Sequence, residues 1–296
     1  MVKNLARALR LPFLTASILP FIFGSFIIRG NFNLAGFIFG LISVAFTHLS
    51  SNLINDYADS RSGVDYEDKR FYPFFGGSKL IQENVFPEKF YLNAAIFCAV
   101  LAFLSVILLA FVLKSTLVIS LYLLVIILSW QYSAKPLQSS YHYLGEVFIF
   151  FLFGPVLVMG GYFIQANILP DLRSFILSLS SGFITAAILI ANEVPDFIGD
   201  QRSNKNNLLR LTGLKNGYII YAALIFLSLS SIVLGVSLRY VNVSALISLL
   251  LVIPAFKAAK ILKDNNSDKM KLLKSSGITI NMQAALSIIL ILSLIL

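Results

Sequence analysis

Long apolar runs recur along the whole chain, and they constrain its fold more than any other feature. A helix of about 20 mostly apolar residues crosses a bilayer core. Nine runs come near that length, at residues 12–29, 34–55, 91–113, 116–131, 144–166, 173–192, 217–237, 243–262 and 277–296. A soluble domain could not bury this surface, because 58% of the residues are hydrophobic and the mean hydropathy is +0.85. We therefore predict an all-α integral membrane protein, with about nine transmembrane helices in one bundle and a single domain over residues 1–296.

The first apolar run follows a basic segment, MVKNLARALRLP, an order that is also typical of a signal peptide. The run is longer than the apolar core of a signal peptide and lacks a small-residue cleavage site. We therefore expect it to be retained as the first span.

The distribution of lysine and arginine predicts the orientation of the bundle. With the N-terminus in the cytoplasm, 19 of the 23 basic residues fall on cytoplasmic segments. Because cytoplasmic loops carry an excess of such residues, we predict a multi-pass protein of the plasma membrane with a cytoplasmic N-terminus. Nearly all polar loops then lie over one face, which is typical of an enzyme supplied from the cytoplasm and from membrane lipid. We expect no nucleic-acid partner.

Two acidic stretches come at the ends of apolar runs. The first, residues 52–70, holds five of the fourteen carboxylates, and the second is NEVPDFIGD at residues 192–200. Asn55 and Asp59 are four residues apart, and so are Asn192, Asp196 and Asp200, so that each set shares a helix face. Acids at the mouth of a membrane helix are costly without a compensating cation. The stretches therefore resemble two halves of one cation-binding site.

The residue types in these stretches suit a magnesium ion and a phosphorylated substrate. Mg²⁺ takes carboxylate ligands and commonly keeps waters and substrate phosphates in the rest of its shell. A diphosphate head with a long hydrocarbon tail would match both the acids and the apolar bundle, and lysine or arginine would complete the anion site. Residues 76–79, Gly-Gly-Ser-Lys, could offer N–H groups and an ammonium to that anion, although an ordinary turn is the alternative.

Five segments together resemble the UbiA-type membrane prenyltransferases. The two signatures are NDYADSRSGVD and NEVPDFIGD. ARALRLPFLTAS, FGGSKLIQENV and YSAKPLQSSYHYLGEVFIFFLFGPVLVMGGYF are similar to other segments of that superfamily. The similarity covers most of the first 215 residues, and the last two spans match only in hydropathy. Gly63, Asp65 and the Gly-Gly-Ser loop resemble the branch that prenylates 1,4-dihydroxy-2-naphthoate in menaquinone biosynthesis.

This resemblance implies roles for particular residues. It implies a Mg²⁺ site under cytoplasmic loops, with Asp59 and Asp196 as the central catalytic acids. The implied metal ligands are Asn55, Asp56, Asp59, Asp65, Asn192, Asp196 and Asp200. The implied donor-binding residues are Arg10, Lys79, Tyr132, Lys135 and Lys205. The chain departs from the pattern at Gly63, where the superfamily often has an acid, and at NNLLRLTG after Lys205.

The resemblance further implies transfer of a polyprenyl group from its diphosphate to an aromatic acceptor within the membrane. 1,4-Dihydroxy-2-naphthoate is the expected acceptor, and 4-hydroxybenzoate, a porphyrin or a glycerol-phosphate lipid are alternatives. A cation-coupled transporter is the alternative from another class, since intramembrane acids also mark transporters. Transporter sites, however, lie near the bilayer midplane in repeated halves, whereas these acids lie at helix ends on one face.

Several polar residues are expected to be structural. His48 and His142 are expected to be hydrogen-bonded structural side chains, and Glu146 to stabilise a helix start. Residues 263–274, KDNNSDKMKLLK, are expected to form a solvated linker. Lys269→Ala should accordingly do almost nothing, whereas Lys135→Ala should impair use of the prenyl diphosphate.

Overall fold

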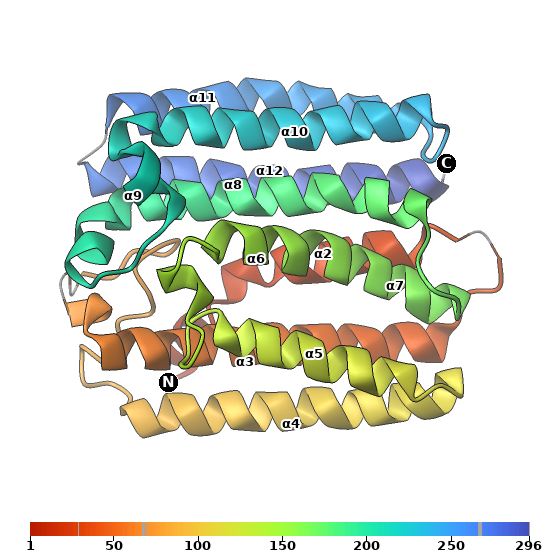
Figure 1. The fold of residues 1–296 in the computed structure, drawn as a ribbon, viewed down its shortest axis with the longest axis horizontal. Coiled ribbons are helices and arrows are strands. Elements are labelled where there is room, and N and C mark those ends of the chain that lie inside the picture. The colour runs from red at the N-terminus through yellow and green to blue at the C-terminus, as the bar shows by residue number, and fades with distance from the viewer. Residues whose placement is uncertain (29, 67, 69, 266–267, 296) are drawn as a thin grey trace.

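The computed structural model is a bundle of helices that run roughly alongside one another (Figure 1). It describes residues 1–28, 30–66, 68, 70–265 and 268–295, and the described residues include no β-strand. Glu67, one of the five carboxylates in the first acidic stretch, and the basic residues Arg29 and Lys69 lie outside the described part.

Among the described residues, eleven helical elements precede α8 (Leu172–Arg202), the helix that carries the second acidic stretch. They are α1 (Val2–Ala8), η1 (Leu11–Phe13), α2 (Thr15–Ser25), α3 (Leu34–Ser62), η2 (Val64–Tyr66), α4 (Glu88–Leu113), α5 (Leu117–Gln131), η3 (Ser139–Tyr141), α6 (Gly145–Phe151), η4 (Leu152–Val156) and α7 (Leu157–Ala166). The remaining elements are α8 (Leu172–Arg202), α9 (Leu208–Thr212), η5 (Leu214–Asn216), α10 (Gly217–Ser237), η6 (Val243–Leu251), α11 (Val252–Asp264) and α12 (Lys269–Ile295).

The predicted all-helical membrane class is confirmed. Among the described residues, seven helices are long and apolar enough to cross a membrane. Two further predicted spans differ from these seven: residues 2–25 form a pair of helices bent by 50°, and α5 is an apolar helix of only 15 residues. The predicted number of about nine spans is reached when the bent pair and α5 are each counted as a span. The prolines at 20, 155 and 254 all lie inside helices, and Pro155 falls in the single π-helical turn η4.

The two helices that carry the acidic stretches are longer than their apolar runs. α3 continues to Ser62 and α8 to Arg202, so the acids lie on the last turns of helices. Polar side chains in these turns can reach the loops while the backbone keeps its helical hydrogen bonds. Gly63 ends α3 with φ of 86°, a left-handed conformation that favours glycine.

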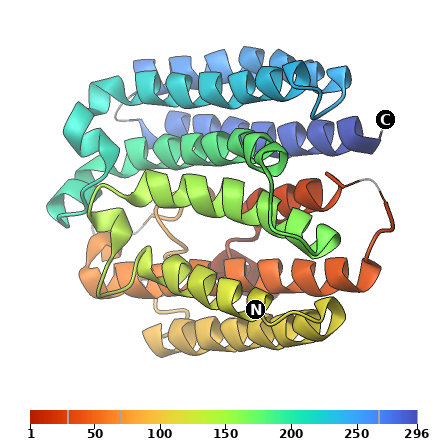
Figure 2. The ribbon, with the colours of Figure 1, turned by 45° about the vertical axis from the view of Figure 1, so that its right-hand side comes forward.

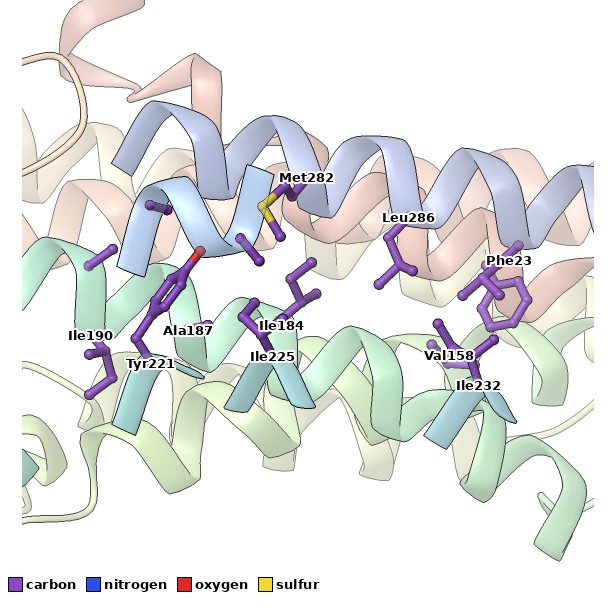
Figure 3. Close-up of a cluster of buried hydrophobic side chains, with 14 of the residues drawn as sticks. Phe23, Val158, Ile184, Ala187, Ile190, Tyr221, Ile225, Ile232, Met282 and Leu286 are labelled. Atoms are coloured by element: carbon purple, nitrogen blue, oxygen red, sulfur yellow. The ribbon is translucent and has the colours of Figure 1, made fainter. Parts of the chain in front are cut away.

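The buried core is distributed over several layers, which appear in the same order in Figures 1 and 2. α8 packs against α10 and α12, α3 packs against α4, and α2 packs against α7. Figure 3 shows part of the largest cluster, where Ile184, Ile225 and Leu286 meet from α8, α10 and α12. The Tyr221 hydroxyl in this cluster lies 3.0 Å from the Thr279 hydroxyl, which satisfies two buried polar groups.

The long connections gather at one end of the bundle. Residues 64–87, 132–144 and 203–216 lie at the left in Figure 1, and the connections at the opposite end are short. The last turns of α3 and α8 and the start of α12 reach the same end. Acids and basic residues that are far apart in the sequence are thereby brought together.

Candidate active site

A cavity of about 1270 Å³ extends from these loops into the bundle. Its deeper wall is largely apolar and includes Phe21, Leu109 and Phe153. Ten of the twelve site residues implied by the sequence line its wall, namely Arg10, Asn55, Asp59, Asp65, Lys79, Tyr132, Asn192, Asp196, Asp200 and Lys205. The two acidic stretches therefore face one space, as the spacing of their acids suggested.

Asp59 is held by direct hydrogen bonds. The Tyr141 hydroxyl donates to Oδ1 over 2.9 Å, and the Asn55 amide donates to Oδ2 over 3.4 Å. The same amide donates to Ser133 Oγ over 2.5 Å. Asp59 is only 6% exposed, so its position is fixed by neighbours from α3 and from the loop after α5. The sequence did not single out Tyr141 or Ser133, because their contacts depend on the path of that loop.

Asp65 folds back over the end of α3 and pairs with Lys79. The Lys79 ammonium donates to Asp65 Oδ1 over 2.8 Å and to the Asp65 carbonyl over 3.0 Å. Gly77, with φ of 78°, lies so close that a Cβ there would be 3.0 Å from both carboxylate oxygens. Burial and the nearby Asp59 carboxylate raise the pKa of Asp65 to about 7, against the opposing effect of Lys79.

Asp56 does not line the cavity. Its carboxylate accepts a hydrogen bond from the Arg10 guanidinium and a second from the Ser78 N–H over 3.1 Å. It is 1% exposed. This placement differs from the metal-ligand role that the resemblance implied, because both oxygens of Asp56 are engaged in holding Arg10 and the Gly-Gly-Ser turn.

The second acidic stretch is held more loosely. Asp200 accepts a hydrogen bond from the Asn207 amide over 3.1 Å, and Gly76 lies so near Asp196 that a Cβ there would be 3.6 Å from Asp196 Oδ1. The nearest ammonium groups lie 3.9 Å from Asp200 and 3.8 Å from Asp196. The buried Asn192 Oδ1 has no hydrogen-bond partner among the described residues. These oxygens are the ones that an incoming cation would satisfy.

Lys205 joins the two stretches. Its ammonium lies 3.8 Å from Asp59 and 3.9 Å from Asp200 and sits over the Tyr141 ring at 5.6 Å. Burial alone would lower the pKa of Lys205, but the carboxylates of Asp59 and Asp200 raise it well above its usual value. Lys205 therefore stays charged between the two halves of the site.

The YSAKP segment divides between the cavity and the surface. Tyr132 lines the cavity, and burial raises the pKa of its hydroxyl, which therefore remains protonated. Lys135, three residues later, is exposed and is not part of the cavity wall. The geometry thus supports a site role for Tyr132 and leaves Lys135 outside the described site.

Lys269 is placed quite differently from the solvated linker that the sequence suggested. α12 begins at Lys269, two turns before the predicted start of the last span, and its ammonium lies 2.9 Å from Asp68 Oδ2 and 3.8 Å from Asp196 Oδ1. The lysine lines the cavity. One sequence signal could have located the start of α12: an aspartate, Asp268, directly precedes Lys269, and aspartate is common at helix N-termini. In the structure its side chain accepts a hydrogen bond from the Lys271 N–H.

The deeper polar residues mostly have structural partners. The Ser17 hydroxyl lies 2.5 Å from His48 Nδ1, in agreement with the expectation of a hydrogen-bonded histidine. Glu146, in the first turn of α6, accepts a hydrogen bond from the Leu208 N–H over 2.7 Å. This bond satisfies a backbone donor at the start of α9, a role that sequence reasoning did not specify.

The residues fit magnesium that is bound together with a phosphate. Among the described residues, no three acidic, histidine or cysteine side chains converge closely enough to cage a metal ion. Mg²⁺, however, commonly uses one or two carboxylates and completes its shell with waters and substrate phosphates. Asp59 and Asp65 on one side and Asp196, Asp200 and the unpartnered Asn192 Oδ1 on the other offer the hard oxygen donors for this mode.

The fold and the cavity define a class of protein: a helical membrane protein with a cavity lined by acids and lysines at its loop end and by apolar side chains deeper in the bundle. Comparison with known families identifies the class further. Residues 17–283 match the UbiA prenyltransferase family, and the chain belongs to this family.

Individual relatives are more distant. A 1,4-dihydroxy-2-naphthoate octaprenyltransferase of Escherichia coli is 28% identical over 207 residues, which covers 68% of this chain and 65% of that protein. The match thus spans less than two thirds of that relative. A UbiA homologue from Aeropyrum pernix in its apo form has a TM-score of 0.74 at 17% identity, over 95% of this chain and 96% of its own. A UbiA homologue from Archaeoglobus fulgidus bound to DMAPP and Mg²⁺ has a TM-score of 0.66 at 19% identity, over 97% and 98%. These structures share the fold.

Proposed function

We propose that this chain is a Mg²⁺-dependent prenyltransferase that moves a polyprenyl group from its diphosphate to 1,4-dihydroxy-2-naphthoate. One observation carries the proposal: a single cavity joins both acidic stretches and their basic partners to an apolar interior. Such a space matches a substrate with an anionic head and a hydrocarbon tail. Membership of the family, the name of the Escherichia coli relative and the ligands of the Archaeoglobus fulgidus neighbour support the same assignment.

The diphosphate head belongs at the loop end of the cavity. Lys79 and Lys205 are buried, charged neighbours of the acids, and an ammonium near phosphate oxygens makes strong charge-assisted hydrogen bonds. Asp59, Asp65, Asp196 and Asp200, with Asn192, would hold Mg²⁺ against the same head. When bound, the metal neutralises charge on the diphosphate and so assists its departure.

The chain's own residues then determine where the reaction occurs. The bond between the allylic carbon and the diphosphate oxygen breaks, and an electron-rich ring carbon of the acceptor bonds to that allylic carbon. For the naphthoate, the attacked carbon loses its carboxylate as CO₂, so that the ring regains its aromatic character. Tyr132 and the apolar wall around Phe153 exclude water from the allylic cation, and aromatic faces stabilise it.

An assay of the purified protein tests this proposal. The protein in detergent or nanodiscs receives an octaprenyl diphosphate, Mg²⁺ and one acceptor from a panel: 1,4-dihydroxy-2-naphthoate, 4-hydroxybenzoate, a porphyrin or a glycerol-phosphate lipid. We expect a prenylated, decarboxylated naphthalene product by mass, lost on chelation of Mg²⁺. A product with another acceptor alone would reassign the acceptor. The absence of any product or released diphosphate would contradict the proposal and return the transporter alternative.

We place the loop end of the bundle in the cytoplasm of a plasma-membrane protein, as one domain. The excess of lysine and arginine at this end supports that orientation. Single cysteines introduced into the 203–216 and 70–78 segments of a Cys98→Ala chain would test it. Labelling from outside intact cells by an impermeant reagent would contradict the orientation.

A further inference from the structure

Lys269 reaches the site from the last helix, α12, whose first half lies within residues 17–283 that match the family, so the expectation of a match in hydropathy alone was wrong for this part of the chain. Its ammonium donates to Asp68 Oδ2 over 2.9 Å and lies 3.8 Å from Asp196 Oδ1. It also sits over the Tyr72 ring, 5.6 Å from the centroid. The side chain is 30% exposed and forms part of the cavity wall. A ligand in the cavity can therefore reach it.

Most acids of the site have a basic side chain within 4 Å, and Lys269 is one of these basic side chains. Arg10 pairs with Asp56, Lys79 with Asp65, and Lys205 with Asp59 and Asp200. Asp196 is the remaining one of the five acids implied as metal ligands, and the Lys269 ammonium is the basic group nearest to it. The sequence resemblance implied the other three basic residues, whereas only the folded structure shows that Lys269 lies at the site.

The hydrogen-bonding capacity of Lys269 is only partly used. An ammonium has three N–H donors. Among the described residues, Asp68 accepts one hydrogen bond, and Asp196 lies beyond hydrogen-bonding distance. Two donors are thus available at the mouth of the cavity, beside the acid that heads the second stretch.

The surroundings hold Lys269 in this place. Phe74, from the same loop as Tyr72, packs so closely on α12 that a Cβ at Gly277 would lie 3.0 Å from its ring. The loop and the helix therefore touch at two levels, at Lys269 and at Gly277. An ion pair between two mobile surface side chains would lack a second contact such as that between Phe74 and Gly277.

We propose that Lys269 is a diphosphate-binding residue, which donates its free N–H groups to phosphate oxygens of the prenyl donor while Asp68 and Tyr72 hold its side chain. This inference rests on the proposed function and adds a residue of the last helix to the donor site. The competing explanation is a purely structural one, in which Lys269 only ties the connection between η2 and α4 to α12 through Asp68.

Binding of an unreactive donor separates the two explanations. The probe is geranyl thiodiphosphate with Mg²⁺, titrated calorimetrically into the purified full chain in nanodiscs. For Lys269→Ala we expect affinity to fall about tenfold to hundredfold, as for loss of a hydrogen-bonded charge. Lys269→Arg keeps a charged donor and should retain most of the affinity. Asp68→Ala removes the acceptor that ties Lys269 to its loop, leaves the ammonium beside Asp196, and should change affinity much less than Lys269→Ala.

Lys271→Ala is the matched control. Lys271 is in the same turn of α12, is 62% exposed, and pairs with Asp268 outside the cavity wall. Its replacement should leave probe binding unchanged, and the KM for the naphthoate acceptor should be unchanged in Lys269→Ala as well.

Two results would overturn the inference: wild-type affinity in Lys269→Ala, or an equal loss in Asp68→Ala, which would assign Lys269 to holding the loop. If the wild-type protein itself fails to bind the probe, the proposed function fails, and this inference falls with it. A thermal melt of each variant without probe identifies any general loss of folding, and Lys269→Arg then provides the comparison at retained charge.

Discussion

The two acidic stretches have similar sequence patterns but very different surroundings. In the first, Asp56, Asp59 and Asp65 each accept short hydrogen bonds from side chains of distant segments. In the second, the ammonium groups stay 3.8–3.9 Å from Asp196 and Asp200, and Asn192 Oδ1 has no partner among the described residues. A repeated motif therefore does not imply two equivalent half-sites.

The difference has a structural cause. The end of α3 is covered by the segments around Arg10, Gly77 and Tyr141, which bring fixed donors to its acids. The end of α8 faces two lysine side chains, one from the 203–216 loop and one from α12, whose ammonium groups lie beyond hydrogen-bonding distance of its acids. Preorganised donors cost little to use when substrate arrives, whereas loosely paired ones can rearrange around it. The acids of the first stretch are therefore held by more direct hydrogen bonds than those of the second.

The largest expected effect is on turnover. Asp59→Ala and Asp196→Ala should each abolish measurable prenyl transfer, a loss of at least about a thousandfold, because each removes the acid at the centre of one stretch. Prenyl-transfer assays at saturating Mg²⁺ measure it. Asp264→Ala, an exposed acid at the end of α11, is the control. Near-normal activity in either site variant would show that one stretch is sufficient.

The next effect distinguishes lysines inside and outside the cavity. Lys79→Ala leaves phosphate oxygens without a buried donor and should cost about 1.5–3 kcal/mol, or about tenfold to hundredfold in kcat/KM for the prenyl diphosphate. Lys135→Ala should have little effect, since the side chain is exposed. This reverses the expectation from sequence for Lys135 and Lys269. Donor-varied kinetics measure both, and an equal loss in the two variants would place Lys135 in the site.

The smallest expected effect is on the stability of the protein without metal or substrate, and it tests the difference between the surroundings of the two acidic stretches. Asp59→Ala removes one hydrogen bond from the Tyr141 hydroxyl and one from the Asn55 amide, and should lower the free energy of unfolding by about 1–3 kcal/mol. Asp196→Ala removes a longer ion pair and should cost less than about 1 kcal/mol. Thermal melts in detergent with a chelator compare them. If Asp196→Ala melts at the lower temperature, the second stretch is the rigid one.

The sequence predicted the membrane bundle well because a bilayer imposes the length of each apolar run. It missed the ends of the helices that matter most for the site. α3 and α8 continue through polar turns to Ser62 and Arg202, and α12 begins at Lys269 rather than at residue 277. Polar turns carry no hydropathy signal, so helix and loop look alike there.

The same limit applied to individual residues. The acids at 59, 65, 196 and 200 were predicted because their spacing is local and matches a family signature. Tyr141 and Lys269 were missed because their places depend on how a loop and a distant helix fold back over the site. Asp56 was assigned to the metal because it lies in the signature, although its partners turn it away from the cavity.

Metal binding with and without an unreactive donor tests the central claim, that the two stretches form one metal site which the diphosphate completes. Mn²⁺ can replace Mg²⁺ as a paramagnetic probe and be titrated into the wild-type chain, Asp59→Asn and Asp196→Asn, each with and without geranyl thiodiphosphate. We predict weak binding to the wild type alone, because no three acids converge among the described residues. We predict much tighter binding with the donor analogue and loss of this gain in both variants. Tight binding without the analogue, or a full gain in either variant, would contradict the account.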